Sequence, residues 1–209
     1  MKPVLYYTAI AVLIVMHAVG LYGLTHNHMT YYRDLTAFNL TLTFVLFLVG
    51  AFRFDLPYLI TILVISAIGL VVEIIGVKTK LIFGDYNYTT ILGPDVIDVP
   101  LVIGLNWGLL IMSCAAIVYN VYNNNLARAM AGATLMLLMD IVLEPIAFKY
   151  NFWQWDTKTI PLQNYIAWWL VSFTMLLGVF SFLKNPHNKM AYWVFGVQFL
   201  FFCLLNLLT

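Results

Sequence analysis

Two carboxylic acids lie four residues apart in the segment MDIVLEPIAFKYNFWQWD, which covers residues 139–156 and is otherwise strongly apolar. They are Asp140 and Glu144, and in a helix this spacing places both side chains on one face. A third acid, Glu73, lies near the end of another apolar run. Neighbouring carboxyl groups can divide the work of a general acid and a general base. The three acids therefore predict a site of proton transfer.

Each of the two glutamates is followed by a basic residue and then by an aromatic cluster that contains an aspartate. The two segments are GVKTKLIFGDYNY, with Asp85, Tyr86 and Tyr88, and PIAFKYNFWQWD, with Trp153, Trp155 and Asp156. Further downstream, VPLVIGLNWGLL and IPLQNYIAWWLV each open an apolar run after a proline. Repeated halves around a central site are common in membrane proteins. The pattern predicts an internal repeat in which each half brings a carboxylate and an aromatic wall to the same face.

The elements that position these residues must be helices in lipid, because 63% of the residues are hydrophobic and only 9% are charged, with a mean hydropathy of +0.92. We predict an all-α integral membrane protein, a bundle of about seven helices that forms one polytopic domain over residues 1–209. Each predicted span is an apolar run close to the roughly 20 residues that cross a hydrocarbon core. The spans lie near residues 4–24, 35–52, 57–77, 99–121, 126–148, 164–183 and 190–208.

The depth of the acids in these spans argues for a purpose. In the fifth predicted helix, Asp140 lies roughly 12 Å and Glu144 roughly 6 Å from the C-terminal end, and Glu73 lies at a depth similar to that of Glu144. A carboxylate at bilayer depth is costly unless it is paired, protonated or directed into a polar cavity. We expect all three acids to border one interior pocket, with Asp140, the deepest, as the proton donor.

The charges are distributed unevenly between the two sides of the membrane. Lys and Arg divide equally, so the excess of basic residues on cytoplasmic loops gives no orientation. Every acid except Asp55, however, lies on or near the side opposite the N-terminus. This asymmetry predicts that the opposite side is the working face.

Plainer interpretations exist for several of these residues. Glu73 and Glu144 are close enough to the interface to serve as anchors paired with Lys78 or Lys149. The tyrosines and tryptophans of the two clusters would suit an ordinary aromatic belt at the membrane surface. Asp140 is deeper and shorter, so it fits an anchoring role less well.

The chain offers little for a metal or a cofactor. Its four histidines are scattered, although HNH at 26–28 could contact a metal, and neither Cys114 nor Cys203 belongs to a metal-binding motif. There is no glycine-rich phosphate loop and no charged groove for a nucleotide. We expect no cofactor, no metal and no nucleic acid partner.

Four ordered segments resemble the membrane-bound carotenoid biosynthesis proteins, whose members include carotenoid 1,2-hydratases and bisanhydrobacterioruberin hydratases. The segments are EIIGVKTKLIFGDYNYTTILGP, VPLVIGLNWGLL, LMDIVLEPIAFKYNFWQWD and IPLQNYIAWW, which together cover most of residues 73–169. The first two predicted helices carry no such signature. The proline-x-Glu-Glu motif of the more distant membrane lycopene cyclases is absent, since here the order is Glu144-Pro145.

The resemblance implies an enzyme that adds water to the terminal alkene of an acyclic carotenoid, in a bacterial or archaeal cell membrane. Such an alkene is unreactive to water at neutral pH, so the reaction must begin with a proton from a strong acid in a dry pocket. Glu144 and Glu73 would then hold water or balance the charge of the resulting cation, while Asp85 and Asp156 would fix the loops. The substrate, a polyene, would enter from the lipid bilayer. The residues expected to bind the end group or position water are Tyr86, Tyr88, Asn106, Trp107, Trp153, Trp155, Gln163 and Asn164.

Two alternatives remain open from the sequence. A lycopene-type cyclase begins with the same protonation, but the next alkene rather than water traps the cation. A pigment-binding or transport protein without catalysis would also contain buried acids, since such acids serve as proton relays. The amide side chains near the acids favour hydration, because they can hold a water molecule.

Overall fold

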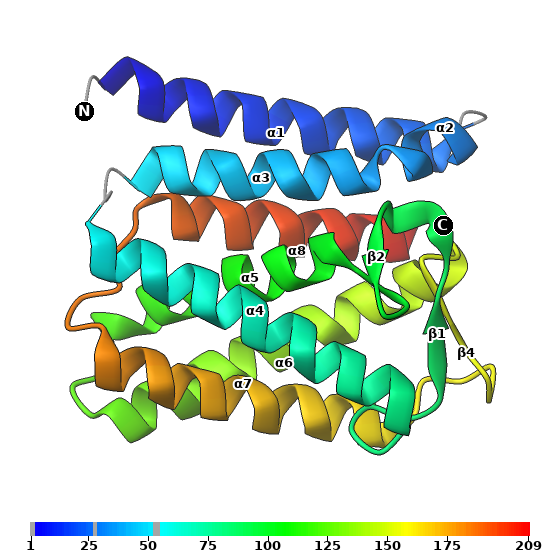
Figure 1. The fold of residues 1–209 in the computed structure, drawn as a ribbon. Coiled ribbons are helices and arrows are strands. Elements are labelled where there is room, and N and C mark those ends of the chain that lie inside the picture. Colours follow the sequence, from blue (N-terminus) through cyan, green and yellow to red (C-terminus); the bar gives the residue numbers. More distant parts are fainter. Residues whose placement is uncertain (1–2, 27–28, 52–54) are drawn as a thin grey trace.

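The structure is a computed structural model that describes residues 3–26, 29–51 and 55–209. These parts of the chain form eight α-helices, and the two longer loops, between α4 and α5 and between α6 and α7, contain small strands (Figure 1). The helices are α1 (Pro3–Thr25), α2 (Met29–Asp34), α3 (Thr36–Ala51), α4 (Leu56–Thr79), α5 (Leu101–Tyr119), α6 (Asn125–Lys149), α7 (Leu162–Phe182) and α8 (Met190–Leu208).

The predicted all-α membrane bundle is confirmed, with one difference in the lengths of the helices. Among the described residues, six helices are long and apolar enough to cross a membrane, namely α1, α4, α5, α6, α7 and α8. The run predicted at 35–52 forms α3, which has 16 residues. At 1.5 Å per residue α3 is about 24 Å long, shorter than a hydrocarbon core of about 30 Å. It is preceded by the separate short helix α2, which contains the adjacent ion pair Arg33–Asp34.

Helix α5 is the centre of the bundle. Of its membrane-spanning window, 78% is buried, compared with 39% or less for each of the other long helices, and α5 packs against α3, α4, α6, α7 and α8. Helices α1 and α3 lie along one edge of the bundle and α7 along the other (Figure 1). Helix α1 begins at one end of the bundle, and α8 finishes at the opposite end, close to the strands.

Glycines let α4 approach α5 closely. A Cβ atom at Gly104 would lie 2.8 Å from the backbone oxygen of Ser66, and one at Gly108 would lie 2.0 Å from the Ser66 hydroxyl oxygen. Both distances are too short for real contacts, and because the atom near Gly104 belongs to the backbone, a larger residue at Gly104 would push the two helices apart. This close packing holds the end of α4, where Glu73 lies, against the start of α5.

The loops at the end where α4 and α6 finish are tied together by strand pairing. Strand β1 (Tyr86–Tyr88) pairs antiparallel with β4 (Trp153–Trp155), so that Tyr86 lies opposite Trp155 and Tyr88 opposite Trp153. A second small sheet joins β2 (Asp95–Val96) to β3 (Val99–Pro100), immediately before α5. Two loops more than 60 residues apart in the sequence therefore form one cover over this end of the bundle (Figure 1).

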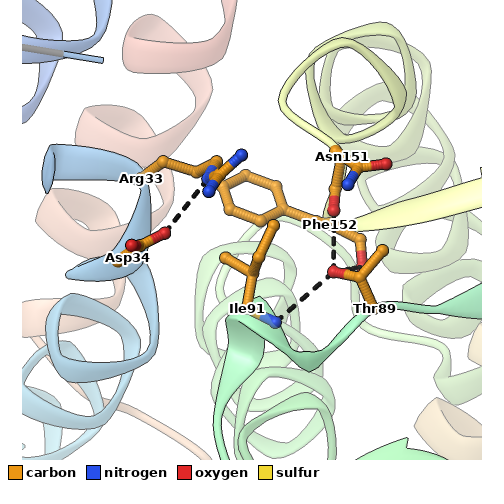
Figure 2. A network of polar contacts seen from close by, with 6 residues as sticks. All are labelled: Arg33, Asp34, Thr89, Ile91, Asn151 and Phe152. Atoms are coloured by element: carbon orange, nitrogen blue, oxygen red, sulfur yellow. Dashed lines mark hydrogen bonds and ion pairs between the residues drawn. The ribbon is translucent and has the colours of Figure 1, made fainter. Parts of the chain in front are cut away.

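Thr89 strengthens the connection between the two loops. Its hydroxyl group donates to the backbone oxygen of Asn151 at 2.7 Å and accepts from the backbone N–H of Ile91 (Figure 2). The latter contact caps the 3₁₀ helix η1 (Thr90–Leu92). The backbone N–H of Thr89 also donates to the oxygen of Phe152 at 3.0 Å. One residue thus continues the β1–β4 pairing and begins the next element.

Candidate active site

Glu73 is buried near the C-terminal end of α4 and accepts three hydrogen bonds from aromatic side chains. The Tyr86 hydroxyl donates to Oε2, and the Tyr88 hydroxyl donates to the same oxygen at 2.9 Å. The indole Nε1–H of Trp107, on α5, donates to Oε1 at 2.9 Å. Both oxygens of Glu73 therefore have donors.

The two tyrosines act as donors because their hydroxyl groups keep their protons. Burial raises the pKa of Tyr86 and of Tyr88 well above the usual value for tyrosine, and the nearby Glu73 carboxylate raises it further. A protonated hydroxyl beside a carboxylate donates its hydrogen bond to the carboxylate. Strand β1 supplies both groups, since residues 86 and 88 point to the same side of a strand.

Glu144 is buried on α6 and has a matching set of three donors. The indole N–H groups of Trp153 and Trp155 both donate to Oε2, at 3.1 and 2.9 Å. Nδ2 of Asn164, on α7, lies 3.4 Å from Oε1. Because Oε1 has only this one long contact, it is the less occupied oxygen of Glu144.

The two glutamate sites are related by the pairing of β1 with β4. Each strand directs alternate aromatic residues at the glutamate that precedes it in the sequence, and the rings meet across the pair. The Tyr86 and Trp155 ring centroids are 5.0 Å apart, and those of Tyr88 and Trp153 are 5.7 Å apart. The two aromatic clusters noted in the sequence therefore converge on one site.

Trp168 is a site residue that the sequence analysis missed. Its ring stacks on Trp107, with centroids 4.4 Å apart and an interplanar angle of 23°. Pro100 and Pro161 are the N-caps of α5 and α7, and each tryptophan follows its proline by seven residues. A closer comparison of VPLVIGLNWGLL with IPLQNYIAWWLV would have identified Trp168 as the counterpart of Trp107.

Asp140 is fully buried on α6, one turn before Glu144. Its Oδ2 accepts a hydrogen bond of 2.8 Å from Asn164 Nδ2, so Asn164 connects Asp140 to Glu144. Its Oδ1 has no hydrogen-bond partner among the described residues. Asp140 contacts the site through Asn164.

A cavity of about 30 Å³ lies between the two glutamates. Such a volume holds one or two water molecules. The polar side chains that helices contribute to the wall of this cavity are those of Glu73, Glu144, Asn106 and Asn164. The stacked rings of Trp107 and Trp168 form another part of the wall. Asp140 is not in this wall, so the expectation that all three acids border one pocket is wrong for Asp140. The reason is that Asn164 stands between Asp140 and the space.

A larger, mainly apolar cavity of about 210 Å³ adjoins the small one. The two cavities share Ile103, Asn106, Leu143 and Trp153 as lining residues. The larger cavity extends between α1, α3, α5, α6 and α8, and its lining includes Val19 and Phe38, which are 48% and 63% exposed on the outside of the bundle. An apolar space therefore reaches from the acids towards the lipid-facing surface.

Other residues expected at the site lie outside the cavity. Gln163 is exposed and donates to the backbone oxygen of Leu81 at 2.7 Å, because it lies one residue before Asn164 and so on a different face of α7. Asp85 forms an ion pair with Lys80 at 2.6 Å, and its backbone oxygen accepts from the N–H of Asp156. The aspartates thus belong to the loop pairing.

The anchoring alternative for the glutamates does not match the contacts of the nearby lysines. Lys78 pairs with Asp98, and Lys149 donates to the backbone oxygen of Thr209. Of the HNH segment, residues 27–28 lie outside the described residues. In the parts of the chain that are described, no group of three or more His, Cys, Asp or Glu residues is placed to hold a metal.

Comparisons with known proteins give the chain a family. The family model described as "Carotenoid biosynthesis protein" matches residues 34–209. The bisanhydrobacterioruberin hydratase of Haloarcula japonica is 29% identical over 119 residues, which are 53% of this chain and 40% of that relative. The chain thus matches less than half the length of this curated relative. No solved structure matches significantly.

Proposed function

The chain belongs to the carotenoid biosynthesis protein family, and on this premise we propose that it adds water to the terminal C1=C2 alkene of an acyclic carotenoid end group. The observation that carries the proposal is the pair of buried glutamates, each with three hydrogen-bond donors, on the wall of one water-sized cavity beside a larger apolar cavity. Hydration of an isolated alkene requires an acid, a water molecule and a dry pocket for the hydrocarbon.

Glu144 is our choice of proton donor. Its Oε2 accepts from two tryptophans, which leaves Oε1, with its single 3.4 Å contact from Asn164, as the oxygen that can carry a proton into the cavity. Both oxygens of Glu73 accept well-formed hydrogen bonds, including 2.9 Å bonds from Tyr88 and Trp107, an arrangement that favours the carboxylate form. Asp140, expected from its depth to be the donor, does not line the cavity, so we assign it a positioning role through Asn164.

The first step transfers the Glu144 proton to carbon 2 of the alkene and leaves a tertiary cation at carbon 1. The faces of aromatic rings attract cations, and the stacked pair of Trp107 and Trp168 lines the cavity. The Glu73 carboxylate, fixed by three donors, lies on the wall of the same cavity and would stabilise the cation electrostatically. This arrangement is preorganised, because the donors to Glu73 are already in place before any charge develops.

The second step adds the oxygen of a water molecule to carbon 1. Asn106 and Asn164 border the small cavity and can hold such a water with their amide groups. The water passes one proton to the Glu144 carboxylate, which restores the acid and leaves a tertiary alcohol. The sum is one alkene and one water giving one alcohol, so the reaction needs no oxidant, reductant or cofactor.

The larger cavity would hold the hydrocarbon that continues from the end group. Its lining is mostly apolar, as a polyene requires. The lipid-facing positions of Val19 and Phe38 at its edge support entry of the substrate sideways from the bilayer.

The test is to produce the protein in a host that accumulates lycopene and to analyse the extracted pigments by chromatography and mass spectrometry. We expect a mass increase of one water for each modified end, with an unchanged visible spectrum because the terminal alkene is not conjugated. A product of unchanged mass with a ring end group would instead identify a cyclase. Unmodified lycopene in the presence of well-expressed protein would refute an enzyme acting on this end group.

A further inference from the structure

Asp140 is a carboxyl group inside the bundle that faces neither of the two cavities. It is fully buried, and it lines neither the small nor the larger cavity. Burying a carboxyl group at membrane depth is costly, and the proposed reaction gives Asp140 no proton to transfer. Its one hydrogen bond with the described residues comes from Asn164 Nδ2, at 2.8 Å. Asp140 can therefore influence the reaction only through Asn164.

The contacts of Asn164 decide which end of its amide group faces the small cavity. Nδ2 donates to Asp140 Oδ2 and lies 3.4 Å from Glu144 Oε1. An amide nitrogen only donates and an amide oxygen only accepts, so an accepting Asp140 holds the nitrogen end. The oxygen, Oδ1, has no donor among the described residues, and Asn164 belongs to the wall of the small cavity. Oδ1 is thus the polar atom that Asn164 offers to the cavity.

Without Asp140, the proposed proton donor would favour the opposite orientation of this amide group. Glu144 would remain as the neighbour of Nδ2, at the longer distance of 3.4 Å. In the proposed reaction Oε1 of Glu144 carries a proton, and a protonated oxygen can donate to the amide oxygen of Asn164. The amide would then turn over, and the proton would be held by Asn164 instead of entering the cavity. Asp140 opposes this rotation because its Oδ2 accepts from the nitrogen end.

The orientation of Asn164 also determines how the attacking water is held. After Glu144 has lost its proton, its Oε1 and Asn164 Oδ1 are both acceptors, so a water molecule between them donates both of its hydrogens. The lone pairs of the water oxygen then point away from these acceptors and into the cavity, where carbon 1 would lie. An amide nitrogen in the place of Oδ1 would instead occupy one lone pair. The observed orientation therefore favours attack by the water oxygen.

A tertiary cation has other outcomes than capture by water. It can return a hydrogen from carbon 2 to the Glu144 carboxylate and form the alkene again, or it can react with the next alkene and close a ring. We infer that Asp140 is a positioning residue that holds the Asn164 amide with its oxygen in the cavity, and that this orientation makes capture by water the preferred outcome. The inference rests on the proposed function and deepens it, because it assigns the choice of product to a residue that contacts neither substrate nor water.

The experiment measures how the cation divides between these outcomes. Membranes that contain the protein are incubated with lycopene in heavy water, so that Glu144 delivers a deuteron to carbon 2. If the cation returns to the alkene, the C–H bond at carbon 2 breaks, its proton goes to Glu144, and deuterium remains in the recovered lycopene. Mass spectrometry gives the ratio of deuterium in recovered lycopene to alcohol formed. A lower amount of folded protein or slower protonation leaves this ratio unchanged.

Variants at Asp140 and Asn164 test the assignment. Asp140→Leu removes the acceptor at similar size and should raise the ratio about tenfold, as the loss of one hydrogen bond to a charged group would give. Asp140→Asn can still accept through its amide oxygen and should raise the ratio less. Asn164→Leu should raise it at least as much as Asp140→Leu. The double variant should match Asn164→Leu alone, because Asp140 acts through Asn164.

The matched control is Gln163→Leu. Gln163 is an exposed amide next to Asn164 in the sequence, and it lines neither cavity. This substitution should leave the ratio unchanged. A ring product of unchanged mass in any variant is counted with the deuterium, since it too comes from a cation that escaped water.

An unchanged ratio in Asp140→Leu would overturn the inference even if less alcohol formed, since Asp140 would then serve folding alone. Loss of both alcohol and deuterium in this variant would also overturn it, because Asp140 would then be the proton donor. Additive effects in the double variant would show that Asp140 acts by a route other than Asn164. Alcohol from the unsubstituted protein with equal ratios in all variants retires only the role of Asp140. Neither alcohol nor deuterium from the unsubstituted protein retires the proposed reaction itself.

Discussion

Replacing Glu144 by glutamine tests the proposed chemistry most directly. The substitution keeps the size of the side chain and removes the proton that the reaction requires. The new amide can still accept hydrogen bonds from Trp153 and Trp155 through its oxygen, as the carboxyl group does at 3.1 and 2.9 Å. The β4 strand should therefore stay in place, and a loss of activity would report on the chemistry rather than on folding.

The expected loss of hydration rate is at least about 100-fold, or ~2.7 kcal/mol of transition-state stabilisation, which is typical of removing a general acid. Asp140→Asn should cost less, about tenfold, because Asp140 contacts the site only through the 2.8 Å hydrogen bond from Asn164. An asparagine at position 140 can still accept this bond through its amide oxygen. The order of the two effects distinguishes a proton donor from a positioning residue.

The assay compares initial rates of hydrated pigment formation in membranes that contain equal amounts of each variant. The control is Asp98→Asn, an acid-to-amide change at an exposed ion pair with Lys78. Asp98 has a φ of 65°, which asparagine tolerates, and the loss of a surface ion pair costs at most about 1 kcal/mol. Near-normal activity of Glu144→Gln together with an inactive Asp140→Asn would refute the assignment and return the donor role to Asp140.

Three further predictions concern the aromatic wall and the helix packing. Trp168→Leu should slow hydration about tenfold, whereas Trp168→Phe should keep most of the activity, because the face of an aromatic ring stabilises the cation. Equal hydration rates for the two variants would contradict this role. Tyr86→Phe removes one of the three donors to Glu73 and should reduce kcat about tenfold with unchanged expression. The reason is that a hydrogen bond to a charged group is worth ~1.5 kcal/mol or more. An unaltered kcat would contradict the catalytic role of Glu73. Gly104→Val should destabilise the protein by about 1–3 kcal/mol, because the Cβ atom of the valine would lie 2.8 Å from the backbone oxygen of Ser66. The measurement is the Tm in detergent, which should fall. An unchanged Tm would mean that α4 and α5 can separate at no cost.

The sequence alone identified the class of protein and the acidic and aromatic residues on which the proposed chemistry rests. Hydrophobic composition and run length depend only on which residues are present, so they predicted the membrane helices directly. The acids were recognisable because a carboxylate in an apolar run is costly and therefore rare. The doubled pattern of glutamate, basic residue and aromatic cluster also predicted that two distant segments serve one face.

The roles of individual side chains near the acids could not be read from the sequence. Asp140 and Glu144 share a face of α6, but only the position of Asn164 on α7 decides which of them reaches the cavity. Gln163 is adjacent to Asn164 in the sequence, yet it points to the loop at Leu81 because successive helical residues are rotated by about 100°. Relative rotation of packed helices is a property of the assembled bundle.

Tertiary structure also decided what the aromatic clusters and the first helix do. The pairing of β1 with β4 turns two apparent membrane-interface belts into donor pairs for Glu73 and Glu144. His17 belongs to a helix without any family signature, and its place in the larger cavity depends on the packing of α1 against α8. A sequence specifies which chemical groups each segment carries. The cavity that these groups face is formed by segments far apart in the chain. Only the packing of those segments determines which polar atoms are left to bind a substrate.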